Sequence, residues 1–332
     1  MTQAADTAAH TPQPEHPLLQ VEGLSIAYRT ARGELRAVEE VSFRLAAGRS
    51  LGLVGESGCG KTTIGLALMG LLPPNGRVTA GRILLQGREL TTLSEEELRR
   101  VRWAQVAMIF QGAMNALNPV HRVGDQIVEA IRTHRPRVSK AEARAQVEGL
   151  FQLVGLPPRR MHDYPHQFSG GMRQRAVIAM ALALNPRLIV ADEPTTALDV
   201  IVQAQILEET RNLQREFDIG IVFISHDISI VAEVCDQIGV MYAGQLVERG
   251  TTAEVFHDPR HPYTQALLAS YPTLAGRRRE LKAIPGEPPE LVGTIPGCRF
   301  CTRCPRPHAA CRLDPPRWRR MSPTHFVLCD QC

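Results

Sequence analysis

The sequence lacks any hydrophobic run long enough to cross a membrane. Its longest apolar runs, at positions 64–72 and 176–184, are far shorter than the ~20 residues that a membrane-spanning helix needs. The first part of the chain, 1–17, contains neither a basic nor an apolar segment, so we expect no secretory signal there. Its polar, proline-containing composition predicts a disordered tail. These absences predict a protein that works in the cytosol.

The chain also has little net charge and no internal repeat. A formal charge of +4 over 332 residues is too small to indicate nucleic-acid binding by itself. No segment recurs at a fixed period, and each motif described below occurs once. The length allows one large domain with an appendage. An apolar content of 44% with 22% charged residues is ordinary for a globular protein.

Hydrophobic patterning predicts a mixture of strands and helices. Alternation of apolar and polar residues favours strands at 18–28 and 35–45. The segment 73–81 reads as a loop, because it is rich in proline and glycine. Ser94 followed by Glu97 predicts the start of a helix. Further along, 120–184 is mostly helical in pattern, 200–217 is an amphipathic helix, and a hairpin is expected around 243–244.

One segment, GESGCGKTT at positions 55–63, matches the phosphate-binding pattern G-x-x-x-x-G-K-[ST]. A glycine-rich turn lets backbone N–H groups converge on a triphosphate, and the following helix adds the positive end of its dipole. A buried strand at 49–55 and a helix at 61–72 supply the required context. The pattern predicts Lys61 on the β- and γ-phosphates and Thr62 on Mg²⁺. The predicted loop comprises Gly55, Glu56, Ser57, Gly58, Cys59, Gly60, Lys61, Thr62 and Thr63.

Acidic residues follow a second predicted buried strand, at 187–194. Ligands of a parallel sheet bind at the carboxyl ends of its strands. Asp192 is therefore placed to hold Mg²⁺, directly or through water, and Glu193 to polarise the attacking water. His226 follows another such strand and can donate to the γ-phosphate, although the spacing alone does not assign it that role.

A second glycine-rich turn, at 167–175, leads into another helix. Ser169, Gly170 and Gly171 place a hydroxyl and exposed N–H groups at a helix N-terminus, which suits an anion. One nucleotide cannot easily be enclosed by two helix N-termini so far apart in one sequence. We therefore expect two chains to share each ATP, one contributing the Gly55 loop and the other the Gly170 loop.

Five segments in this order resemble the ATPase subunit of an ABC transporter: GESGCGKTT, MIFQ, FSGGMRQR, LIVADEPTTALD and ISHD. The resemblance covers residues 18–257. It implies an α/β fold, with an ABC-type P-loop ATPase core, an antiparallel β subdomain and a helical subdomain at about 112–184. We place a boundary near 258, where the composition changes, so that 258–332 forms a Cys-rich C-terminal extension of the oligopeptide-importer type.

The resemblance also implies roles for single residues. Tyr28 would stack on adenine, and Gln111 would link Mg²⁺ to the membrane partner. Ser169 and Gly171 would contact ATP across the dimer, and Asp199 would lie in the loop between the two sites. The chain departs from the family at position 112, where glycine follows Gln111 in place of the expected aspartate.

A narrower resemblance concerns the dipeptide/oligopeptide importer branch, which includes nickel importers. YPHQFSGGMRQR, DEPTTALDVIVQAQIL, VMYAGQLVERG and HPYTQALL are similar to that branch, and the GMRQR and PTTALD segments to its D-type ATPase. The resemblance implies ATP-driven import of peptides at the cytoplasmic face of the cell membrane. It implies two integral membrane permease subunits, a second, paralogous ABC ATPase and an extracytoplasmic substrate-binding protein. Nickel or another small solute is the alternative cargo.

A soluble ABC ATPase acting on nucleic acid is the alternative from another class. It would need long heptad arms or a zinc insertion, and neither is visible in the sequence. A translation-associated ABC protein usually carries two motif sets, whereas this chain has one. A scaffold that uses the cysteine tail for electron transfer would not need the intact hydrolytic motifs. We therefore expect no nucleic-acid partner.

Six of the eight cysteines lie between positions 298 and 332. In a reducing cytosol such a cluster favours a metal over disulfides. The C-x-x-C-x-x-C spacing favours Cys301 among the metal ligands. Some members of the importer branch carry an iron–sulfur cluster, and the resemblance to that branch implies a ligand set without Cys301. A [4Fe–4S] cluster is the preferred occupant, with zinc or unligated thiols as alternatives. The set implied by the resemblance is Cys298, Cys304, Cys311 and Cys329.

Overall fold

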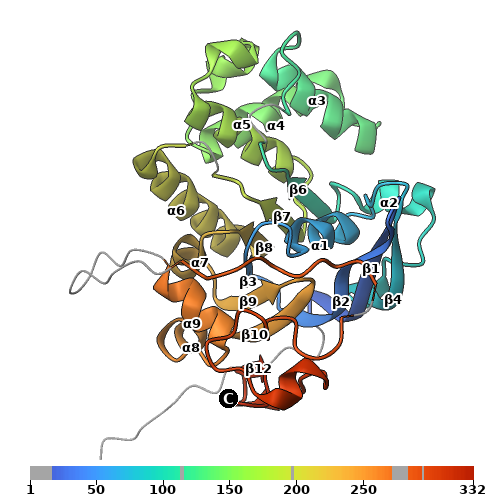
Figure 1. The fold of residues 1–332 in the computed structure, drawn as a ribbon. Helices are drawn as coiled ribbons and strands as arrows, with labels where there is room; N and C mark the ends of the chain where they lie inside the picture. Colours follow the sequence, from blue (N-terminus) through green and yellow to red (C-terminus); the bar gives the residue numbers. More distant parts are fainter. Residues whose placement is uncertain (1–16, 113–115, 196–197, 271–282, 294) are drawn as a thin grey trace, which may run out of the picture.

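The computed structural model describes residues 17–112, 116–195, 198–270, 283–293 and 295–332. Within these ranges the strands form a sheet of four, in the order β2-β1-β4-β5, and a sheet of eight, in the order β11-β12-β10-β9-β3-β8-β7-β6 (Figure 1). The tail expected at 1–17 lies outside the described residues except for its last position. No helix in the described ranges is both long and apolar enough to span a bilayer.

The four-stranded sheet is antiparallel and is built around β1. It contains β1 (Leu19–Thr30), β2 (Gly33–Leu45), β4 (Gly76–Leu85) and β5 (Arg88–Glu89). The prediction of a loop over 73–81 is wrong, because β4 begins at Gly76, which pairs with Tyr28 of β1. The edge of β1 offers backbone partners that local composition does not reveal. A Cβ at position 76 would come within 2.6 Å of the Tyr28 ring, so a larger residue there would have to displace that ring.

One part of the eight-stranded sheet is parallel and almost entirely buried. It contains β3 (Ser50–Val54), β6 (Val106–Ile109), β7 (Leu188–Asp192) and β8 (Gly220–Ser225). Since β3 pairs with β8, and β8 with β7, in parallel, their carboxyl ends lie at one edge. The loops that begin with Gly55, Glu193 and His226 leave from this edge. The expected hairpin is confirmed as β9 (Gln237–Tyr242) and β10 (Gln245–Thr251).

The helices follow the predicted pattern closely. Ser94 and Glu97 form the expected capping box at the start of α2. α1 ends at Leu68, before the expected position 72, because Gly70 adopts a positive φ of 60° and turns the chain. In Figure 1, α3, α4 and α5 gather beyond the β6 edge of the large sheet. The helices are α1 (Lys61–Leu68), α2 (Glu95–Val101), α3 (Val123–His134), α4 (Lys140–Leu153), α5 (Gly170–Leu182), α6 (Val200–Phe217), α7 (Ile228–Val234), α8 (Thr252–His257) and α9 (Pro262–Ala269), with 3₁₀ turns η2 (Pro158–His162), η3 (Pro165–Gln167) and η4 (Ala309–Arg312).

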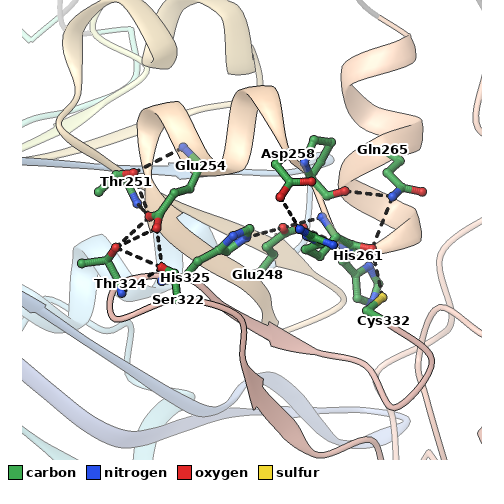
Figure 2. A network of polar contacts seen from close by, with 12 residues as sticks. Glu248, Thr251, Glu254, Asp258, His261, Gln265, Ser322, Thr324, His325 and Cys332 are labelled. Carbon is green, nitrogen blue, oxygen red and sulfur yellow. Dashed lines mark hydrogen bonds and ion pairs between the residues drawn. The ribbon is translucent and has the colours of Figure 1, made fainter.

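The C-terminal strands join the same large sheet. β11 (Trp318–Arg320) pairs with β12 (Phe326–Leu328), and β12 pairs antiparallel with β10. Beside this junction the carboxylate of Glu248, fully buried, accepts hydrogen bonds from His325 Nε2 at 2.7 Å and from the backbone N–H of His261 at 2.9 Å (Figure 2). The extension therefore continues the sheet that carries the phosphate loop.

Candidate nucleotide-binding and hydrolysis site

The phosphate loop leaves β3 in a conformation that only glycine tolerates. Gly55 and Gly60 have φ values of 153° and 105°. A Cβ at Gly55 would lie 2.1 Å from the carbonyl oxygen of Met241, and one at Gly60 would lie 2.4 Å from that of Ala37. The loop is thus enclosed between β2 and the β9–β10 hairpin, which fixes the direction of its backbone N–H groups.

Lys61 lies inside the loop and is 6% exposed. Its Nζ donates to the carbonyl oxygens of Gly55 at 2.7 Å and Glu56 at 3.0 Å. The nearby Cys59 thiol remains protonated, because burial raises its pKa more than the Lys61 charge lowers it. The Lys61 ammonium also donates to the Cys59 sulfur at 3.5 Å. An ammonium held by neutral acceptors of this kind is prepared for an anion, since phosphate oxygens bind it more strongly.

Asp192 ends β7 next to the first turn of α1 and is 2% exposed. Burial raises its pKa and the neighbouring Glu193 raises it further, while a hydrogen bond from Thr62 lowers it. Within the described residues its Oδ1 atom is buried without a hydrogen-bond partner. A carboxylate oxygen beside a hydroxyl is the kind of oxygen pair that Mg²⁺ prefers. Thr62 and Asp192 therefore fit the magnesium site expected from the sequence.

Three residues predicted from the sequence lie together beside Asp192, where Glu193 contacts both Gln111 and His226. Glu193 Oε2 accepts a hydrogen bond from Gln111 Nε2 at 2.9 Å, and Glu193 Oε1 lies 3.0 Å from His226 Nδ1. The Glu193 side chain is 16% exposed and that of His226 is 58% exposed. These residues follow β7, β6 and β8, so the parallel order of the sheet brings them together. The arrangement can orient a carboxylate toward water next to a bound γ-phosphate.

Tyr28 lies at the mouth of the phosphate loop. Its hydroxyl donates to Thr63 Oγ1 at 3.1 Å, which joins the end of β1 to the first turn of α1. A ring at this position is placed beside the phosphate loop, where the base of a nucleotide can reach it.

The second glycine-rich turn lies apart from the first within one chain. Ser169 caps α5 by accepting a hydrogen bond from Met172 N at 3.3 Å, and Asp199 caps α6 in the same way through Val202 N at 2.9 Å. Both caps are exposed. Gly170 and Gly171 form the first turn of α5. No hydrogen bond or ion pair among the described residues connects these caps with residues 55–63.

Two residues that sequence reasoning missed hold Glu56 of the phosphate loop. The backbone N–H of Glu56 donates to the Tyr263 hydroxyl at 2.9 Å. Arg303 donates to both carboxylate oxygens of Glu56, at 2.7 and 2.9 Å. Since both partners lie more than 200 positions away in the sequence, no local pattern identifies them.

Five cysteines of the C-terminal extension line one small cavity, together with His261, Phe300 and Arg306. Burial raises the pKa of Cys298 to about 11 and also raises that of Cys304. In the described part of the chain, however, no group of three or more His, Cys, Asp or Glu residues is arranged to hold a metal ion. The geometry therefore does not support the expected cluster by itself. The five cysteines are Cys298, Cys301, Cys304, Cys311 and Cys329.

The fold and the site together define an ABC-type ATPase. The family model for ABC transporters matches residues 38–196, and the model for the C-terminal region of oligopeptide/dipeptide transporters matches residues 247–311. The chain covers 98% of the matched chain in a solved dimer of the ATP-binding cassette MJ0796 bound to ADP and phosphate. The TM-score is 0.63 and the sequence identity 25%, over 70% of this chain.

Two relatives that match over most of their length indicate the branch of the ABC transporter family to which the chain belongs. The chain is 47% identical to the dipeptide transport ATP-binding protein DppD of Bacillus subtilis, over 94% of both chains. It is 49% identical to the oligopeptide transport ATP-binding protein OppD of the same organism, over 93% of this chain and 87% of that protein. The chain therefore belongs to the ABC transporter family, as a D-type ATP-binding subunit of the dipeptide/oligopeptide branch.

Proposed function

We propose that this chain hydrolyses ATP to power the import of peptides through a separate membrane permease. The observation that carries the proposal is the contact of Glu193 with Gln111 and His226 beside the Thr62–Asp192 pair. Its support for peptides is the 47–49% identity to ATP-binding proteins of dipeptide and oligopeptide transport.

The proposed mechanism assigns a role to each residue of the site. Lys61 exchanges the loop carbonyls for the β- and γ-phosphate oxygens. Thr62, Asp192 and Gln111 would hold Mg²⁺, which when bound would neutralise charge on the transferred phosphoryl group. Glu193 takes a proton from the attacking water, and His226 orients Glu193 and donates to the γ-phosphate. Tyr28 stacks on the adenine.

A second ATPase chain completes the site in this proposal. Ser169, Gly170 and Gly171 of this chain would bind the γ-phosphate held by the second chain, and the corresponding turn of the second chain would bind the γ-phosphate held by this one. Asp199 would lie between the two sites. ATP can favour the closed pair because it contacts both chains only in that state. Hydrolysis removes this differential contact, and the chains separate. We propose the same division of the chain as above, at 18–257 and 258–332.

The proposed partners are two integral membrane permease subunits, a paralogous ATPase and an extracytoplasmic binding protein, with this chain peripheral at the cytoplasmic face. Affinity purification from native membranes tests the proposal. Co-purification of two membrane proteins with a second ATPase is the expected result, whereas DNA or ribosomal partners would contradict it. In the reconstituted complex, ATP hydrolysis should be stimulated by peptide-loaded binding protein. Stimulation by nickel ions in place of peptides would favour the nickel alternative.

We further propose that the cysteine cavity holds a [4Fe–4S] cluster bound by Cys298, Cys304, Cys311 and Cys329, with Cys301 as the competing ligand. The resemblance to the importer branch supports this, and five thiols of the extension line one cavity. Ligation would have to remove protons from Cys298 and Cys304, whose pKa values burial raises. Anaerobic purification should yield about four iron atoms per chain and a visible absorption band. Cys298→Ser should abolish both, while Cys332→Ser, outside the cavity, should retain them. Zinc or no metal would overturn the proposal.

A further inference from the structure

A residue of the C-terminal extension reaches the phosphate loop directly. The two guanidinium nitrogens of Arg303 donate to the two carboxylate oxygens of Glu56, at 2.7 and 2.9 Å. The Arg303 side chain is 4% exposed and that of Glu56 is 27% exposed. A buried, two-point pair of this kind fixes both distance and orientation, which a single-point contact does not.

Arg303 is itself held rigidly. Its Nε donates to the carbonyl oxygen of Pro285 at 2.8 Å, and its remaining contacts are with the carbonyl oxygen of Ile284 and the hydroxyl of Tyr242, both at 3.3 Å. The hydrogen bonds to Glu56 raise the pKa of Arg303 further above its usual range. The extension and the β9–β10 hairpin therefore hold the Arg303 guanidinium in one orientation as a hydrogen-bond donor.

The backbone of Glu56 is held as well. Its N–H donates to the hydroxyl of Tyr263, a fully buried residue of α9. The Tyr263 ring lies 4.6 Å from that of Tyr242 and 5.4 Å from that of Phe300, between centroids. The carbonyl oxygen of Glu56 in turn accepts from Lys61. One residue of the phosphate loop thus connects α9 and the extension with the lysine that binds phosphate.

We propose that Arg303 and Tyr263 are positioning residues for the phosphate loop, so that the C-terminal part of the chain sets its affinity for nucleotide. Neither residue needs to touch ATP. They hold Glu56 in the conformation in which the loop N–H groups and Lys61 face one point. Arg303 lies between Cys301 and Cys304, so the loop that lines the cysteine cavity is also the loop that holds Glu56. The proposal rests on ATP binding and not on the identity of the transported solute.

The test compares variants of Arg303 and Glu56 in the purified transporter complex. We expect Arg303→Ala to weaken binding of a fluorescent ATP analogue with Mg²⁺ about 10-fold, because it removes hydrogen bonds to a charged group. The KM for ATP should rise by a similar factor while kcat stays within about twofold, since the hydrolytic residues are untouched. Arg303→Lys should be intermediate, because an ammonium cannot make the two-point contact.

A double-mutant cycle separates positioning from general loosening of the fold. If the pair acts as a unit, Arg303→Ala added to Glu56→Gln should cost much less affinity than it does alone. The matched control is Arg317→Ala, which removes an exposed arginine of the extension that is not among the residues lining the cysteine cavity. It should leave nucleotide affinity within twofold of the wild type.

Three results would overturn the proposal. These are an Arg303→Ala affinity within twofold of the wild type, full additivity with Glu56→Gln, or an equal loss of affinity in Arg317→Ala. A transporter that carries a solute other than peptides would leave all these affinity measurements unchanged, so failure of the proposed cargo and failure of this inference are distinguishable.

Discussion

Glu193 adopts a positive φ of 46°, a backbone conformation that costs a non-glycine residue about 1 kcal/mol. The surrounding structure maintains it, because its backbone N–H donates to Ile224 O at 2.9 Å and its carboxylate contacts Gln111 and His226. Strain of this kind, held in place by several contacts, is common where a side chain has to point at a reacting group.

Replacement of Glu193 by glutamine should separate binding from hydrolysis. The amide has the same shape but cannot take a proton from water, so we expect hydrolysis to fall by about 10²–10⁴-fold. ATP binding should persist, and a closed, ATP-bound pair of chains should accumulate. Phosphate release and size-exclusion chromatography with Mg-ATP measure the two effects. Unchanged turnover would remove Glu193 from the role of base.

Lys61→Ala should abolish nucleotide binding or turnover, because the loop loses its only side-chain ammonium. Equilibrium binding of a fluorescent ATP analogue and the rate of phosphate release check this. Lys140→Ala, which removes an exposed lysine at the start of α4, is the matched control and should change neither. Normal affinity and rate in Lys61→Ala would contradict the proposed phosphate site.

At the scale of elements, helix N-termini supply both structure and binding groups. α4 and α5 begin with the same device, a serine whose hydroxyl accepts the N–H three residues later, at 3.2 Å for Ser139 and 3.3 Å for Ser169. Only the cap of α5 lies within the segment FSGG. The two hydroxyl caps are alike, although α4 also has a reciprocal hydrogen bond from the Ser139 N–H to Glu142 at 2.8 Å. They differ in the role that we propose for them.

Ser169→Ala and Ser139→Ala should each lower the free energy of unfolding by about 1 kcal/mol, through the lost cap. Only Ser169→Ala should also lower the ATPase rate of the assembled complex, by about 10-fold or more, because it removes a donor from the γ-phosphate. Chemical denaturation and phosphate release measure the two quantities. Equal ATPase rates in both variants would contradict the shared site.

At the scale of the whole molecule, a polar network attaches the C-terminal extension to α8 and β10. Glu254 accepts hydrogen bonds from Thr251, Ser322 and Thr324, at the end of the network seen in Figure 2. Burial would raise its pKa, but these hydrogen bonds outweigh burial and lower the pKa from 4.5 to about 2. The ionised form of Glu254 therefore stabilises this attachment.

The sign of the pH dependence follows from the lowered pKa. The contribution of Glu254 is complete above pH 4.5 and is lost as the pH falls toward 2. Glu254→Gln should lower the free energy of unfolding by about 1 kcal/mol at pH 7, a small value because solvent screens a half-exposed group. The difference from the wild type should shrink below pH 4.5, as measured by denaturant titration. Glu216→Gln, on the exposed face of α6, should show no such pH-dependent difference.

The expected α/β core, the antiparallel sheet, the helical region and the capped helices could all be predicted from the sequence. The residues that we propose for hydrolysis were suggested by a related pattern, since Asp192 ends a strand of apolar residues, and Glu193 and His226 each directly follow such a strand. The start of β4 could not be predicted from the sequence. Its local composition favours a loop, whereas pairing with β1 places the segment in the sheet.

By itself the sequence determined the phosphate loop, the helix starts and the buried strands, because each depends on neighbours within about ten positions, through glycine conformation, capping and apolar periodicity. Only the tertiary structure decided that Glu193 meets Gln111, and that Arg303 and Tyr263 hold Glu56. These contacts join residues distant in the sequence, and the order of strands in the sheet and the path of the extension across it bring them together.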